Sequence, residues 1–96
     1  MTRFWMECNV EKAGERMESA LTMQHGKTVV KCGGELTVTV IGRRRSPLVY
    51  KVRLMEMKRG YVLVDFRLSK GDGIEFKKFF MQVRNRVRSF IVSAPT

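Results

Sequence analysis

Residues 62–80 read V-L-V-D-F-R-L-S-K-G-D-G-I-E-F-K-K-F-F, and their hydrophobic period changes in the middle of the stretch. In the first part apolar residues occupy alternate positions, which is typical of a strand with one face in a core. These positions are Val62, Val64, Phe66 and Leu68. The residues from Ser69 to Gly73 are typical of turns, so the strand is expected to end there.

After the turn, apolar residues recur every three or four positions and predict one buried stripe of a helix. The stripe consists of Phe76, Phe79, Phe80, Val83, Val87 and Phe90. Asp72 is the expected N-cap, and Glu75 stands three residues later, as in a capping box. The stretch therefore predicts a strand, a tight turn and a long amphipathic helix.

The rest of the chain predicts four more strands and one more helix. Residues 2–7, 27–32, 35–41 and 48–57 are the expected strands, and a helix capped by Asn9 is expected to close at His25-Gly26. Short antiparallel hairpins flanked by two helices predict an α+β fold, with a sheet of four to five strands and both helices on one face. The expected order is strand, helix, four strands, helix. At 96 residues the chain is expected to form one domain, residues 1–96.

Composition points to an anionic partner and away from catalysis. The formal net charge is +10, from 19 basic and 9 acidic residues. Such an excess suits an acidic or phosphorylated protein surface, anionic lipid or nucleic acid. His25 is the only histidine, and Gly71-Asp72-Gly73 lacks the further residues of a nucleotide-binding loop. We therefore expect a non-catalytic domain without cofactor.

Cys8 and Cys32 are the only cysteines. They lack the spacing of a zinc site, so no metal is expected, and we interpret them as reduced, largely buried thiols. The sequence contains neither the apolar segment of a signal peptide nor a stretch long enough to span a membrane.

Three groups of basic residues are candidates for anion binding. Arg43, Arg44 and Arg45 are adjacent in a loop, and Lys51 and Arg53 alternate on the strand face opposite the core. On the last helix Lys77, Arg84 and Arg88 are expected to form a row beside the apolar stripe. Clustered guanidinium groups bind phosphate or carboxylate well. The arginine triplet and the helix row are equally consistent with anion binding and with charges that only keep the domain soluble, and both interpretations stay open.

Apolar residues are also expected on the sheet face that the helices leave uncovered. They are Trp5, Leu63, Tyr61 and Val49. Several such residues close together indicate a docking surface. A small second core beneath the first segment is the alternative, and the sequence does not decide between the two.

The stretch D-F-R-L-S-K-G-D-G-I-E-F-K-K-F-F, residues 65–80, resembles the end of the C-terminal kinase-associated domain of DNA-damage checkpoint effector kinases, the checkpoint kinase one family. Met1-Thr2-Arg3-Phe4 is similar to the M-T-R-F-F start of that domain, and Leu54-Met55-Glu56-Met57 to its L-L-E-M. Residues 14–45 match only in pattern. Lys77-Lys78-Phe79-Phe80 carries an aromatic residue where relatives have histidine, which leaves local detail open.

The resemblance implies a regulatory domain that folds back onto the kinase domain of the same protein and restrains it. The contact residues that it implies are Thr2, Arg3, Phe4, Asp65, Arg67, Lys70, Asp72 and Lys77. The same two motifs imply nuclear export and import signals, hence a nuclear protein that shuttles to the cytoplasm. Binding to anionic lipid is the second hypothesis, because related kinase-associated domains use basic surfaces. The chain shows no motif for specific nucleic-acid binding.

Overall fold

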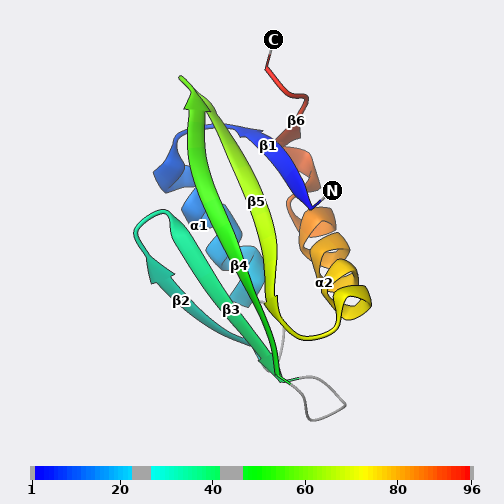
Figure 1. Cartoon of the computed structure of the whole chain (residues 1–96). Helices are drawn as coiled ribbons and strands as arrows, with labels where there is room; N and C mark the ends of the chain where they lie inside the picture. Colours follow the sequence, from blue (N-terminus) through cyan, green and yellow to red (C-terminus); the bar gives the residue numbers. More distant parts are fainter. Residues whose placement is uncertain (1, 23–26, 42–46, 96) are drawn as a thin grey trace.

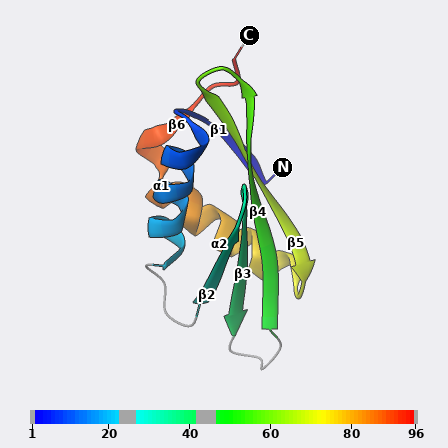
Figure 2. The same ribbon diagram turned by 90° about the vertical axis from the view of Figure 1, so that its left-hand side faces the viewer.

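The computed structural model describes residues 2–22, 27–41 and 47–95. Along the chain the elements are β1 (Arg3–Glu7), α1 (Val10–Thr22), β2 (Lys27–Cys32), β3 (Glu35–Ile41), β4 (Pro47–Lys58), β5 (Tyr61–Lys70), α2 (Gly73–Arg86), the 3-10 turn η1 (Arg88–Phe90) and β6 (Ile91–Val92). The strands form one antiparallel sheet in the order β2-β3-β4-β5-β1-β6. Both helices lie on one side of this sheet, which confirms the predicted α+β class (Figures 1 and 2).

The described residues contain six strands, one more than predicted, because the last helix is shorter than its apolar spacing suggested. α2 ends at Arg86, where the backbone N–H of Val87 is bonded to the carbonyl of Val83, 3.2 Å away. The turn η1 then redirects the chain, and β6 pairs with Trp5 and Met6 of β1. Two paired residues leave no periodic pattern, so β6 could not be recognised in the sequence.

The same helix end corrects two predictions about single residues. Phe90 follows the helical spacing but lies in η1 and is 39% exposed, so it does not belong to the buried stripe. Arg88 also lies in η1, so it does not continue a helical row with Lys77 and Arg84. No helix among the described residues is both long and apolar enough to cross a bilayer.

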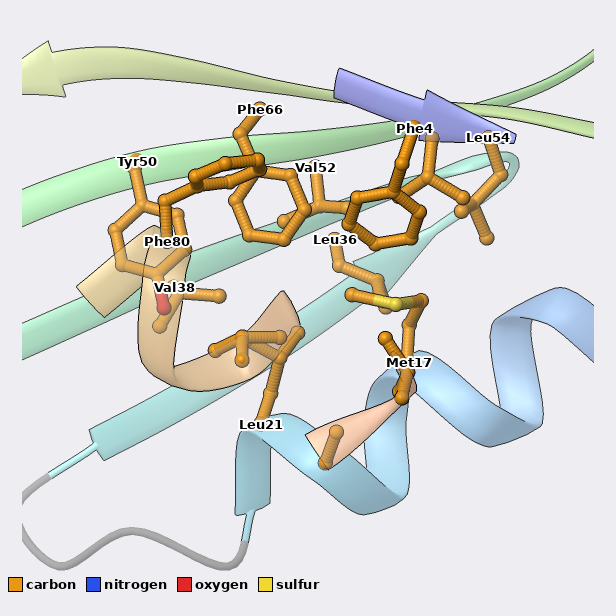
Figure 3. Packing of buried hydrophobic residues seen from close by; sticks show 14 of the residues in the cluster. Phe4, Met17, Leu21, Leu36, Val38, Tyr50, Val52, Leu54, Phe66 and Phe80 are labelled. Carbon is orange, nitrogen blue, oxygen red and sulfur yellow. The ribbon is translucent and has the colours of Figure 1, made fainter. Parts of the chain in front are cut away.

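The core lies between the sheet and the two helices, and aromatic rings fill its centre (Figure 3). The centroid of the Phe66 ring lies 5.9 Å from the ring centroid of Phe4, 5.9 Å from that of Tyr50 and 5.0 Å from that of Phe80. Burial of the Tyr50 hydroxyl strongly raises its pKa. Aromatic pairs at these separations add to the stabilisation from area burial alone.

Alternation predicted the core face of the long strands, with one exception in β5. Leu48, Tyr50, Val52 and Leu54 of β4 are buried, as are Val62, Val64 and Phe66 of β5. Leu68 lies opposite the buried Tyr50 of β4 but is itself 37% exposed. The register against β4 also shifts near this end, between Val49 and Tyr50.

Both helices begin at the predicted N-caps. The Asn9 side chain accepts a hydrogen bond from the backbone N–H of Lys12, 2.7 Å away. The Asp72 carboxylate accepts one from the N–H of Ile74, 3.3 Å away. The predicted closure of the first helix at His25-Gly26 lies outside the described residues.

Gly71 makes the tight turn between β5 and α2 possible. Its φ of +118° is a conformation that side chains rarely adopt, and a Cβ there would lie 2.6 Å from Leu48 Cδ1 and 3.1 Å from Leu48 Cα. A glycine at this position therefore satisfies both the backbone angle and the close approach to β4.

We expect Gly71→Ala to lower the free energy of unfolding by about 2–4 kcal/mol, because strain and overpacking act together. Gly73→Ala is the matched control, since no atom would lie within 4 Å of its Cβ. It should change stability by less than about 0.5 kcal/mol. Urea denaturation of both variants tests this, and equal effects would show that Leu48 does not constrain the turn.

Candidate partner-binding surface

The sheet face turned away from the helices carries three of the predicted contact residues, Arg3, Asp65 and Arg67. On this open face, strand pairing aligns side chains into rows across neighbouring strands. In one row Arg53 lies opposite Glu35 on β3 and Asp65 on β5, and Asp65 lies opposite Arg3 on β1. In the next row Lys51 lies opposite Arg67. Residues from four strands thus form one charged surface.

The ion pairs on the open face join exposed cations to partly buried carboxylates. Glu35 lies 3.9 Å from the amine of Lys51 and 3.6 Å from Nε of Arg53. Asp65 accepts a hydrogen bond from Nε of Arg67, 3.2 Å away on the same strand. Such pairs contribute little to stability. In these two rows the four cations Arg3, Lys51, Arg53 and Arg67 accompany two carboxylates, so the rows keep an excess of positive charge that suits an acidic partner.

A shallow depression of about 290 Å³ lies at one end of this face. Its lining includes Thr2, Arg3, Asp65 and Arg67, four of the eight predicted kinase-contact residues. The Thr2 hydroxyl donates a hydrogen bond to the carbonyl of Phe66 at 2.8 Å, and the N–H of Phe66 donates to the carbonyl of Thr2 at 2.8 Å. These bonds fix the start of β1 beside β5.

The other four predicted contact residues are spread over different environments. Phe4 is only 5% exposed and packs against Phe66 and Phe80, so its side chain serves the core and not the surface. Lys70 ends β5, roughly 17 Å along the strand from Asp65. Asp72 caps α2, and Lys77 is exposed on that helix.

The apolar residues of the open face form a third row. Trp5 lies opposite Leu63 on β5 and Val92 on β6, and Met55 lies opposite Leu63. Leu63 is only 7% exposed, whereas Trp5, Met55 and Val92 are half-buried. Leu63 is therefore the centre of a small second cluster, and its neighbours keep apolar surface in contact with water.

The two other predicted members of the apolar set are also half-buried. Tyr61 donates a hydrogen bond from its hydroxyl to the carboxylate of Glu7, 3.4 Å away, and Val49 pairs with Lys70 and Thr39. The open face thus contains both a small second cluster around Leu63 and apolar surface that remains available for docking.

The predicted anion-binding residues do not form one cluster in the described part of the chain. Arg43, Arg44 and Arg45 lie outside the described residues. Lys51 and Arg53 belong to the open face, Arg84 is half-buried on α2, and Arg88 is exposed in η1. Glu35 lies beside both Lys51 and Arg53. The sequence did not identify it as a site residue, because its neighbours depend on the register between strands.

The cysteines differ from each other. Cys32 is exposed at the end of an edge strand, which corrects the prediction of a buried thiol, and Cys8 is half-buried. Burial raises the pKa of the Cys8 thiol, and the nearby Arg16 partly offsets this rise. Within the described ranges no three His, Cys, Asp or Glu side chains are grouped as a metal site would require.

Comparison with known proteins relates the chain to one class of kinase. No protein-family profile matches it. It is 36% identical to the serine/threonine-protein kinase grp of Drosophila melanogaster, over all of this chain and 19% of that protein. It is 34% identical to the serine/threonine-protein kinase chk-1 of Caenorhabditis elegans, and 36% to that of Caenorhabditis briggsae, over 95% of this chain and 18% of each kinase. The chain thus spans about one fifth of these relatives, a C-terminal region outside their kinase domain.

A solved structure has the same fold. A chain in the crystal structure of the adenylate sensor from AMP-activated protein kinase superposes with a TM-score of 0.74. The match covers 88% of this chain and 94% of that one at 9% identity, so the likeness concerns the fold alone.

The different environments of neighbouring residues 3 and 4 give a direct test of their roles. Phe4→Ala should lower the free energy of unfolding by about 3–5 kcal/mol, because it opens a cavity beneath β1. Arg3→Ala, at an exposed site, should change it by less than about 0.5 kcal/mol. Thermal or urea denaturation measures both, and a large loss for Arg3→Ala would mean that the open-face charges are structural.

Proposed function

Because the chain is homologous to the C-terminal, non-kinase region of checkpoint serine/threonine kinases, we propose that it binds the kinase domain of its own protein and holds it inactive. In this proposal the open face is the contact surface. Arg3, Asp65 and Arg67 recognise charged groups of the kinase domain, and Trp5 and Met55 supply the apolar contact.

One observation carries this proposal. The two motifs that resemble the kinase-associated domain lie about sixty residues apart in sequence, and β1–β5 pairing places Arg3 directly opposite Asp65. Arg3 of the first motif therefore lies in one patch with Asp65 and Arg67 of the second. Interfaces combine an apolar centre with a charged rim, and the row of Trp5, Leu63 and Met55 beside the charged rows has this composition.

Weak binding suffices for restraint within one chain. Tethering raises the effective concentration of the two domains to about millimolar for short flexible linkers, so a modest affinity keeps the kinase domain covered. Activation is then a shift of population toward the open form, caused by any event that favours the separated domains.

The proposal predicts inhibition in trans, measured with the cognate catalytic domain. Adding this chain should lower phosphorylation of a peptide substrate in a saturable manner. Arg3→Glu and Arg67→Glu should each raise the half-inhibitory concentration at least fivefold, because charge reversal at a contact repels the partner. Arg59→Glu, the same charge change in an exposed turn, should leave it within twofold.

Two results of this assay would contradict the proposal. One is the absence of inhibition by the unaltered chain at several hundred micromolar. The other is an equal loss of inhibition with Arg59→Glu, which would indicate attraction by net charge alone.

We also propose that the domain contributes to the nuclear localisation of the parent protein, which shuttles to the cytoplasm. Lys70, Lys77 and Lys78 are exposed and accessible to a transport receptor. Microscopy of the full protein with these lysines changed to alanine tests this role separately from inhibition.

Binding to anionic lipid is the second candidate function, and one surface of α2 favours it. Ile74 is 69% exposed and Met81 is 50% exposed. They lie seven residues apart, on one face of the helix. Lys77, Lys78 and Arg84 lie beside them on the same helix. Apolar side chains surrounded by cations suit the boundary between acyl chains and acidic headgroups.

Sedimentation with phosphatidylserine vesicles tests this candidate. Binding is expected at low salt and should weaken in 0.5 M salt, since each basic residue near the surface contributes about 1 kcal/mol. Changing Ile74 and Met81 to serine should reduce it, whereas Val30→Ser, at a site 57% exposed on β2, should not. Binding that ignores the Ile74 and Met81 changes would exclude α2 as the lipid contact.

A further inference from the structure

A groove lies between α1 and the chain segment that follows α2, apart from the open face. Its volume is about 480 Å³. It is lined from α1 by Lys12, Glu15, Arg16, Ser19 and Ala20, and from the other side by Arg86, Val87 and Phe90. α1 lies on the helix side of the sheet, opposite the open face (Figure 2). A ligand in this groove would leave the proposed kinase contact accessible.

The apolar part of the groove comes from residues that the core does not fully cover. Val87 is buried and Ala20 is only 5% exposed, so both anchor the groove to the core. Phe90 is 39% exposed, although it carries a large aromatic ring. A partner's apolar side chain placed against this ring would remove that area from water.

Arg16 is already positioned for an anion. Its guanidinium carbon lies 4.0 Å from the centre of the Phe90 ring, a cation–π arrangement. It also interacts with the Cys8 thiol. A guanidinium held in this way loses little conformational freedom when a carboxylate binds it.

The other charges of the groove also favour an anionic ligand. Lys12 has one weak contact, to Glu15 at 3.8 Å, and both side chains are more than half exposed. In the part of the chain that the structure describes, no carboxylate lies within 4.0 Å of Arg86. Three cations thus face one acid across an apolar floor.

We propose that this groove binds an acidic peptide segment that carries apolar side chains. Carboxylates of the segment would pair with Arg16, Arg86 and Lys12, and one apolar side chain would pack on Phe90. The segment belongs to a partner protein.

Other occupants fit the groove less well. A second copy of this chain is disfavoured because each copy carries a net charge of +10. Two elements border the groove, so an extended or helical segment can follow it more closely than a flat bilayer can. The exposed Ile74 and Met81 of α2 are a separate surface, so loss of lipid binding and loss of peptide binding would be caused by different substitutions.

The test uses a fluorescein-labelled peptide of twelve residues, made of Glu and Asp with two leucines four positions apart. Fluorescence anisotropy should show saturable binding to the chain. Replacing both leucines by serine, or all acids by their amides, should weaken it at least fivefold. Chemical shifts in the 15N spectrum of the chain should change at Arg16, Arg86 and Phe90, and not at Trp5 or Arg67.

Variants of the chain separate the groove from general attraction by charge. Arg16→Glu combined with Arg86→Glu should weaken binding at least tenfold. Arg59→Glu combined with Lys78→Glu makes the same charge change at two exposed positions outside the groove and should stay within twofold. Phe90→Ser keeps every charge and should weaken binding at least threefold. Circular dichroism checks folding, and Arg86→Glu alone replaces the double variant if Arg16 proves necessary for stability.

Three results would overturn the proposal. The first is an equal loss of peptide affinity in the Arg16/Arg86 variant and in the Arg59/Lys78 control variant. The second is unreduced binding of the peptide without leucines. The third is a set of chemical-shift changes confined to the open face. The readout is peptide binding and not kinase activity. A negative result would therefore leave the proposed inhibition of the kinase domain unaffected, and a failure of that inhibition would leave the peptide-binding proposal unaffected.

Discussion

The antiparallel pairing of β1 with β5 is the constraint on which the rest of the structure depends. It places Phe4 against Phe66 and Phe80 on the covered face of the sheet. On the other face it places Arg3 opposite Asp65. Since side chains of a strand alternate between its two faces, one alignment builds the core and the charged surface together. A slip of one residue would exchange these two sets and destroy both.

Strand and helix periods predicted most of the core and the class of fold. Asp72 was identified as a cap from its place before an apolar stripe, because a short acceptor at that position satisfies free backbone N–H groups. Alternation also predicted that Lys51 and Arg53 face away from the core. It could not predict that Lys51 neighbours Arg67, or that Glu35 neighbours Arg53, because period fixes the face of a residue and not the register between strands.

The prediction that failed most clearly is the end of the last helix. Phe90 has the spacing of the buried stripe, and neither glycine nor proline occurs in residues 87–94 to mark a stop. The helix ends nonetheless, because the following turn lets Ile91 and Val92 pair with β1. The pairing of β6 with β1 thus overrode the helical spacing of the apolar residues. The same change of direction forms the groove beside Arg16, which could not be predicted from the sequence.

The position of β1 within the sheet also determines the order in which the domain can be completed. Within this domain β1 precedes the other strands in the chain, yet it lies in the sheet between β5 and β6, the two strands that come last in chain order. Until about sixty further residues are synthesised, its Trp5 and Phe4 have no strand on either side. Folding therefore includes a late, long-range closure step, which is intrinsically slow compared with formation of local hairpins. Until β5 and β6 are available, the apolar side chains of β1 remain exposed, and such surfaces favour aggregation.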